Sequence, residues 1–299
     1  MFEPLKFENF EAIDAYADIS YRTSESKPIK QRTNQIQIFY NIHGQQTIKV
    51  NDTVFETVPG DMVIIPDWSR ISISNLLEGA KYNMIQYDPG IFMRNELLSP
   101  HLDMAVTNIR KYGSMLLHFP KQSDKKIRSL FDKYDYHSGF GLEVMRFSTL
   151  LMFIEHINKL LESVEPPKYE PPKVLIAVDY INRYFDKNIQ LEDIADAMKI
   201  TTRHMGVIFK DFTQITPKQY IDYLRINIAK LTIKTYESSI NDAFSATGYN
   251  TYSSFYRTFR KFTGETPEEY QKRYNNNPKM FYNEKFLSKI SDKVSEDYR

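Results

Sequence analysis

The N-terminal third of the chain carries the apolar and polar patterning that is typical of β-strands. Gln35–Tyr40 is rich in β-branched and aromatic residues, and Thr47–Val50 alternates between apolar and polar positions. Turn pairs at Asn51–Asp52 and Pro59–Gly60 separate further strand-like runs, which are Thr53–Val58, Asp61–Pro66 and Arg70–Ser74. Short strands at this spacing, continuing to about Tyr87, predict a small sandwich or barrel.

After Asn95 the pattern becomes helical. Apolar residues recur close to the helical period between Leu142 and Val164, at Leu142, Met145, Leu150, Ile154, Ile157 and Leu161. Met152, Phe153 and Leu160 widen this stripe beyond what one packing face needs. Two compatible interpretations stay open: the helix covers the sheet, or it also packs against a second copy of the chain.

The clearest boundary is Glu165–Lys173, which holds four prolines in nine residues. Such a segment cannot be helix interior and favours an extended, semi-rigid spacer. The sequence therefore predicts an N-terminal domain over residues 1–164, a linker over 165–173 and an all-helical domain over 174–275. Asn275–Pro278 breaks the last helix, and residues 276–299 are expected to form a charged tail.

One pattern in the helical domain occurs twice, fifty residues apart. Its aromatic, basic, threonine and proline positions match in register, pairing Phe209, Lys210, Phe212, Thr213, Thr216, Pro217 and Tyr220 with Phe259, Arg260, Phe262, Thr263, Thr266, Pro267 and Tyr270. A repeat at a fixed offset indicates one supersecondary unit used twice. Thr216–Pro217 has the cap and first-position proline that open a helix, and Ile221, Leu224, Ile228 and Leu231 give that connecting helix its expected stripe.

The pattern of each unit predicts a short helix, a turn and an exposed second helix. In the first unit Thr201 is the expected cap, and Met205, Ile208, Phe209 and Phe212 are expected to face inward. In the second unit Thr251 is the cap, and Phe255, Phe259 and Phe262 face inward. The outward positions are Thr202, Arg203, Gly206, Val207 and Lys210 in the first unit, and Tyr252, Ser253, Tyr256, Arg257, Arg260 and Lys261 in the second.

This arrangement predicts two helix-turn-helix motifs, whose second helices enter the major groove of DNA. Arg257 is suited to bidentate contact with guanine, whereas Arg260 and Lys261 are better placed for phosphate. If the connecting helix fixes both units, a separation of about 34 Å would place the reading helices in successive grooves. For any single exposed residue, simple solvation is the competing interpretation.

Composition changes this picture little. The 299 residues carry a formal net charge of +1, so overall charge favours neither acidic nor basic partners. Between Ala243 and Gly264, however, there are three basic residues and no acidic ones. The chain has no cysteine, which excludes disulfides and thiolate metal sites and fits a reducing compartment. No apolar stretch approaches the length of a membrane span, so we expect a cytoplasmic protein without membrane partners.

The second unit resembles the AraC/XylS family of transcription regulators. The family signature is carried by Ile240, Gly248, Tyr249, Phe259, Arg260, Lys261, Gly264, Thr266, Pro267 and Tyr270. The resemblance covers residues 181–274 and implies two helix-turn-helix motifs joined by one helix, where Arg225 and Ala229 match family positions. Departures from the family pattern are Ala243–Phe244, Gln214 in place of glycine, and the small side chains of Gly206 and Val207. The first unit is therefore expected to read few bases directly and to rely on DNA shape.

Val58–Pro66 resembles a segment of the cupin-like sensor domain found in many members of this family. A metal site is not expected, because His43 stands alone and Trp68–Arg70 lies where a later histidine ligand often occurs. No cofactor is expected, and enzymatic chemistry in the barrel would lack its Lewis acid. The residues expected to line an effector pocket are Arg32, Tyr40, His43, Trp68 and Tyr82. Phe2–Tyr21 is expected, by resemblance, to form an arm over this pocket.

These features together predict an α+β protein: an N-terminal cupin-like β-barrel with flanking dimerisation helices, then an all-α domain with two helix-turn-helix motifs. The expected function is a homodimeric DNA-binding transcription regulator, an activator by resemblance, that binds an operator and RNA polymerase. A sugar or related metabolite is the leading effector class. Two alternatives remain: a regulator of this family without a small ligand, controlled by a partner protein or by abundance, and an enzyme with a catalytic barrel.

Overall fold

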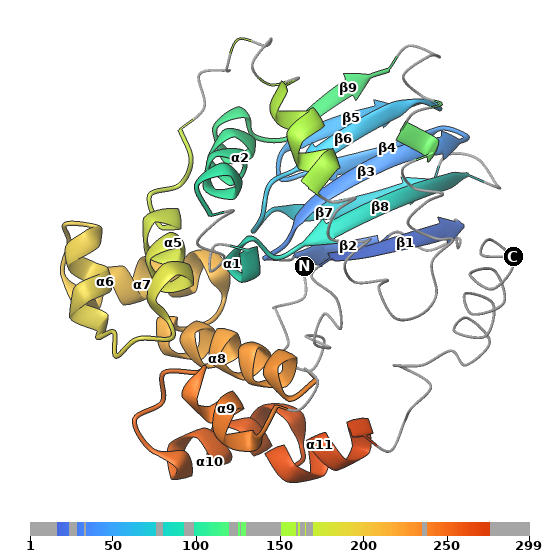
Figure 1. Cartoon of the computed structure of the whole chain (residues 1–299). Coiled ribbons are helices and arrows are strands. Elements are labelled where there is room, and N and C mark those ends of the chain that lie inside the picture. The colour runs from blue at the N-terminus through green and yellow to red at the C-terminus, as the bar shows by residue number, and fades with distance from the viewer. Residues whose placement is uncertain are drawn as a thin grey trace, which may run out of the picture.

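The computed structural model describes residues 17–23, 29–32, 34–75, 80–92, 99–119, 125, 127–129, 151–159, 161, 165, 170–234 and 238–275. A β-sheet domain with its covering helices lies on one side, and an all-helical domain lies on the other (Figure 1). The structure thus confirms the predicted α+β class and the order of its two parts.

Two antiparallel sheets form the N-terminal domain. The five-stranded sheet has the order β1-β8-β3-β6-β9, with bounds Ala17–Thr23, Lys81–Tyr87, Ile36–His43, Asp61–Ile65 and Met115–His118. The four-stranded sheet has the order β2-β7-β4-β5, with bounds Ile29–Arg32, Arg70–Asn75, Gln46–Val50 and Thr53–Thr57. The alternation seen in the sequence assigns one set of side chains to each face of these strands.

The two faces of the five-stranded sheet have different neighbours. Side chains on the inner face meet those of the second sheet in an apolar core of Phe39, Ile48, Val50, Val63, Ile65, Ile71, Ile73, Tyr82 and Met84. The outer face carries Ile36, Ile38, Tyr40, Met62, Ile64, Ile85 and Tyr87. Helices cover this outer face, so both sides of the sheet are buried.

The covering helices come from the segment after the barrel. α1 spans Pro89–Phe92 and α2 spans Ser99–Tyr112, and residues 151–159 are also helical. Ile109 of α2 packs in the same cluster as Ile154, Ile157 and Leu161. These three residues of the predicted stripe therefore cover the sheet, whereas Met152 is exposed. Leu142, Met145 and Leu150 lie outside the described residues.

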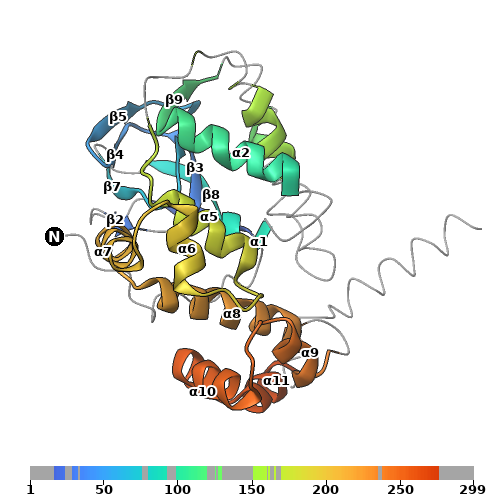
Figure 2. The ribbon, with the colours of Figure 1, turned by 90° about the vertical axis from the view of Figure 1, so that its left-hand side faces the viewer.

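Seven helices are described in the C-terminal part, shown in yellow to red in Figures 1 and 2. They are α5 (Leu175–Tyr184), α6 (Leu191–Ala197), α7 (Thr202–Thr213), α8 (Pro217–Lys234), α9 (Ile240–Ser245), α10 (Tyr252–Thr263) and α11 (Pro267–Asn275). The N-terminal half of α8 packs with α5, α6 and α7, and its C-terminal half packs with α9, α10 and α11. One helix therefore joins two small cores, as the sequence predicted.

The buried surface of α8 is wider than the predicted stripe. Ile221 and Leu224 are buried, but Ile228 and Leu231 are only half-buried. The residues of α8 that pack in the second core are instead Ile226, Ala229 and Ile233. A helix that packs between two cores needs two apolar faces, and the single stripe of the sequence analysis described only one of them.

Three strands were absent from the sequence prediction. β1 pairs with β8, β2 pairs with β7, and β9 pairs with β6. The part of the predicted arm that falls on residues 17–21 belongs to β1, so for these residues the arm prediction was wrong. Residues 2–16 of the arm and the tail at 276–299 lie outside the described residues.

Candidate nucleic-acid interface

The first helix-turn-helix unit, formed by α6 and α7, is fixed by caps at both helix starts. Gln190 and Asp193 form a reciprocal capping box at α6. Thr201 adopts an extended conformation, and its side chain accepts a hydrogen bond from the backbone N–H of His204 at 3.3 Å. This confirms the predicted cap of α7.

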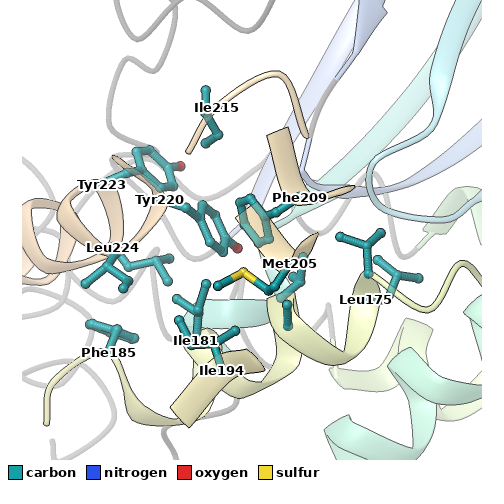
Figure 3. Packing of buried hydrophobic residues seen from close by; sticks show 14 of the residues in the cluster. Leu175, Ile181, Phe185, Ile194, Met205, Phe209, Ile215, Tyr220, Tyr223 and Leu224 are labelled. Atoms are coloured by element: carbon teal, nitrogen blue, oxygen red, sulfur yellow. The ribbon is translucent and has the colours of Figure 1, made fainter. Parts of the chain in front are cut away.

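The inward residues of α7 hold the unit together. Met205 and Phe209 are fully buried, and Ile208 and Phe212 are half-buried in the same cluster. Met205 and Phe209 lie in one cluster with Ile194 of α6 and Leu224 of α8 (Figure 3), so they join the first helix of the unit to α8. The predicted inward face is confirmed.

The opposite face of α7 is open to solvent. Arg203 and Lys210 are exposed, Val207 is 53% exposed, and a Cβ added at Gly206 would meet nothing within 4 Å. His204, which the sequence analysis did not include, is exposed as well. The exposed surface of α7 therefore has a small apolar centre at Gly206–Val207 and a basic residue on either side.

The second unit, formed by α9 and α10, repeats this construction. Ser239 and Asp242 form a capping box at α9, and Thr251 caps α10 by accepting from the N–H of Ser254. Phe255 and Phe259 are fully buried. Their rings lie 5.7 Å apart, edge to face, which extends the aromatic core behind the reading helix.

The outward face of α10 is the more basic of the two. Tyr256, Arg257, Arg260 and Lys261 line one shallow hollow on the protein surface. Within the described part of the chain, Arg257 and Lys261 enter no ion pair. A basic, open surface on a helix of this kind suits contact with phosphates and base edges.

Tyr252, also predicted to face outward, has a structural partner. Its hydroxyl donates to Glu268 Oε1 at 2.6 Å, and its ring packs edge-on against Phe244. Burial, followed by this hydrogen bond to a carboxylate, raises the pKa of Tyr252 to about 12. Tyr252 is therefore tied to α11 at one end of the reading surface.

Arg225, one of the positions that matched the family, joins the segment between α5 and α6 to the second unit. Its guanidinium donates to the backbone carbonyls of Phe185 at 2.6 Å and Lys187 at 2.8 Å. It also lies 4.9 Å from the ring centre of Tyr249, whose hydroxyl donates to Asp222. One side chain of α8 thus links the segment after α5 to the turn of the second unit.

The predicted effector residues are not brought together. Tyr82 lies in the core between the sheets, but Tyr40 faces the covering helices, and Trp68 packs in the apolar cluster of the first unit. His43 is exposed near the end of β3, and Arg32 lies in β2 opposite Arg70. Neither Tyr40 nor Trp68 therefore lines the barrel interior, because strand alternation and the turn after β6 direct them elsewhere.

The barrel interior contains a neutral polar group that the sequence analysis missed. Asn41 Nδ2 donates to Thr57 Oγ1 at 3.1 Å, and the Thr57 hydroxyl donates to the backbone carbonyl of Gln46 at 3.0 Å. All three side chains are buried. Within the described residues, both amide atoms of Gln46 and Oδ1 of Asn41 have no hydrogen-bond partner. The described residues also contain no group of three side chains suited to a metal ion.

Two family descriptions match this chain. A Helix-turn-helix domain matches residues 194–273, and an AraC-like ligand binding domain matches residues 19–144. These ranges coincide with the two helical units and with the barrel. The chain belongs to the AraC family of transcription regulators, which are not enzymes.

Curated relatives share the DNA-binding part. The melibiose operon regulatory protein of Escherichia coli (strain K12) is 32% identical over 31% of this chain and 31% of its own length. The lactose operon transcription activator of Staphylococcus xylosus is 31% identical over 35% of this chain and 37% of its own length. The matches thus span about a third of these relatives.

Among solved structures, an apo variant of ToxT from Vibrio cholerae is similar with a TM-score of 0.45 and 12% identity. That match covers 86% of this chain and 97% of the other. Within the described residues, no helix is long and apolar enough to cross a bilayer.

Proposed function

We propose that the protein is a sequence-specific regulator of transcription that reads DNA with α7 and α10. The open basic face of α10 carries this proposal, because it stands on a rigid aromatic core and directs three cations to solvent. α7 has fewer polar readers and is expected to contribute phosphate contacts and the apolar surface of Val207. A valine at this position suits the methyl group of thymine.

Substitutions on α10 test this proposal. Arg257→Ala should weaken binding and relax the preference at one base pair, with a loss of about 1–3 kcal/mol against the preferred base. Lys261→Ala should weaken binding to all sequences about equally and reduce the salt slope by about one. Both effects are measured by titrating a duplex that the wild-type chain has selected from a random pool. Unchanged affinity in both variants would refute the assignment of this face.

We further propose that a small neutral effector binds in the barrel, with a sugar or related metabolite as the leading class. The unpartnered amide of Gln46 and the unpartnered Oδ1 of Asn41 support this, because together they offer one donor group and two acceptors to hydroxyl groups without a formal charge. The sugar operons named for two relatives point in the same direction. Activation of transcription, contact with RNA polymerase, homodimer formation and a cytoplasmic location belong to this proposal.

A thermal-shift panel of neutral sugars and polyols tests the effector proposal. A ligand at about one hundred times its Kd should stabilise the wild type by about 2.7 kcal/mol. Gln46→Leu, on β4, should abolish the shift, whereas Gln37→Leu, at the start of β3, serves as the control. Gln37 already pairs with Gln86 at 3.1 Å, so its loss should leave the ligand-induced shift in place.

A regulator without a small ligand is the second candidate. The nine buried apolar side chains between the sheets favour it, because they already fill much of the barrel interior. Under this alternative no compound of the panel stabilises the wild type. Control would then come from a partner protein or from abundance.

A further inference from the structure

The four-stranded sheet has one face that the described helices leave open. Ile48, Ile71 and Ile73 pack in the core between the sheets, so the residues next to them in β4 and β7 face away from that core. Lys49 on this outer face is exposed, and its register partner Ser72 is half-buried. The described helices that pack on the barrel cover the other sheet (Figures 1 and 2). Within the part of the chain that the structure describes, the outer face is therefore accessible to a ligand.

The end of this face near the β4–β5 turn is basic. Arg70, at the start of β7, stands directly opposite Arg32 of β2, and Lys30 and Lys49 share the same face by register. Like charges directly opposite each other in a sheet are destabilising. Asp52 is the nearby carboxylate, but it is 95% exposed and lies 3.9 Å from Arg70, so the ion pair is weak. This end of the sheet therefore suits an anionic ligand.

The basic end of the sheet adjoins the first helix-turn-helix unit. Trp68 stands two residues before Arg70, and its ring lies 6.3 Å from that of Phe212 near the end of α7. In Figure 2 the four strands of this sheet and α7 lie on the same left-hand side of the molecule, with α7 below β2. α6 and α8 pack on the inner side of α7, so its exposed face is turned to the same side as the open sheet face.

Basic side chains continue from the sheet to α7. Lys210 and Lys218 are exposed, and each stands two residues before an aromatic residue that contacts Trp68. Two carboxylates lie along this path: Asp211 is exposed beside Lys210, and Glu56 lies at the far end of the sheet face. The cations outnumber them, so one basic surface extends from the reading helix over the near end of the sheet.

We propose that the DNA bound by the first unit continues over the open face of the four-stranded sheet, where Lys49 and Arg70 contact its phosphates. The duplex backbone is the polyanion that suits this face, because α7 would hold it on the same side of the molecule. This inference rests on the proposed function, since it presupposes that α7 binds DNA. Phosphate contacts add affinity without sequence preference, so the N-terminal domain would extend the footprint beyond the bases that the two units read.

Duplexes of two lengths test the proposal. A duplex that the wild-type chain has selected from a random pool is trimmed to the base pairs that the selection fixes. It is then extended on either side by about ten base pairs, which is one helical turn. Extension beside the first unit should steepen the dependence of log affinity on log salt by about two, at about 0.9 for each contacted phosphate. Extension on the other side should leave the salt slope unchanged.

Single substitutions locate the contacts. Lys49→Gln and Arg70→Gln should each remove about 0.9 of the added slope, and unchanged binding to the trimmed duplex shows that each variant folds. Lys49→Arg keeps the charge and should keep the slope. Lys159→Gln is the matched control, because Lys159 lies on the helix over the other sheet and pairs with the exposed Glu155 at 3.0 Å, as Arg70 pairs with Asp52.

Two results would overturn the proposal. One is a salt slope that is equal on the trimmed and extended duplexes, and the other is a slope that neither Lys49→Gln nor Arg70→Gln reduces. Either result would leave an acidic protein surface as the ligand that suits this face. If the wild type selects no duplex, the proposed function fails together with this inference. If Arg257→Ala weakens binding while extension has no effect, only this inference fails.

Discussion

Asp88 is a buried carboxyl at the boundary between the two domains. It accepts hydrogen bonds from Asn34 Nδ2 at 2.8 Å and from the backbone N–H of Gly90 at 2.9 Å. Burial raises its pKa to about 7, the two hydrogen bonds act in the opposite direction, and the charge of Asp67 adds to the rise. Burial raises the pKa of Tyr220 and of Tyr223 on α8, and the charge of Asp88 adds to both rises.

This environment predicts that docking of the domains weakens as pH rises. The protonated carboxyl is favoured in the docked state. Its contribution to the free energy of docking is therefore fully present below pH about 4 and is lost as pH rises through about 7. One proton per molecule corresponds to a change of up to about tenfold in the docking equilibrium per pH unit. Acrylamide quenching of Trp68 between pH 5 and 8 measures this dependence.

Asp88→Asn should reduce the slope of Trp68 quenching against pH. Burial also raises the pKa of Asp179, so a smaller slope of the same sign should remain. His118→Gln is the control, because the His118–Asp61 pair at 2.6 Å lies on β9 and β6. A slope that is the same in Asp88→Asn and in the wild type would exclude Asp88 as its source.

Trp68 shows what sequence cannot decide for a single residue. Its position in a short turn between strands and its aromatic character agree with a pocket residue, and the sequence analysis assigned it to the effector site. Its backbone has a φ of 62°. Its ring packs against Phe212 and Tyr220, which lie 144 and 152 positions further along the chain. Partners this distant leave no local signal, and the same holds for Arg110 and Asp179.

At the scale of elements, the helices of the two units were predictable because their signals are local. A cap, a helical stripe and a threonine–proline exit each depend on neighbours within one or two turns. Gln214 is an exception to these local signals, because a left-handed position at the end of a helix usually carries glycine. It ends α7 in the left-handed conformation with a φ of 67°, where the second unit has Gly264. Its side chain donates to the carbonyl of Asp211 at 2.7 Å, which offsets part of the strain.

The three strands that the sequence did not predict lack such local signals. β1, β2 and β9 lie at sheet edges, where one face or one side of the backbone is less constrained and the apolar alternation is weak. β9, for example, alternates between half-buried and exposed residues. Each is recognisable only from its partner strand, which for β1 begins more than fifty residues later. Pairing over such distances is a tertiary property.

On the scale of the whole molecule, the chain is a series of three bodies joined at two junctions. Contacts of Trp68 with Tyr220 and of Arg110 with Asp179 join the N-terminal domain to the helices around the first unit. Arg225 and Gly248 join the segment after α5 to the second unit. The sequence predicted the bodies, since each has its own core and its own periodicity. It did not predict the junctions, whose contacts depend on how finished domains meet.

Gly248 makes the second junction testable. Its φ is +73°, and a Cβ at this position would lie 2.2 Å from the backbone carbonyl oxygen of Asp186. Gly248→Ala must therefore displace one backbone from the other, in addition to the strain of a left-handed alanine. We expect a loss of about 3 kcal/mol or more in the free energy of unfolding.

Gly264→Ala separates these two effects. Gly264 has a nearly equal φ of +80°, but a Cβ there would meet nothing within 4 Å, so only the conformational strain of about 1 kcal/mol applies. Urea unfolding followed by circular dichroism compares the two variants. Because Gly248 sets the spacing of the units, its variant should also shorten the protected DNA footprint, whereas Gly264→Ala should retain it. Equal losses of stability in both variants would mean that the close approach to Asp186 does not hold the units together.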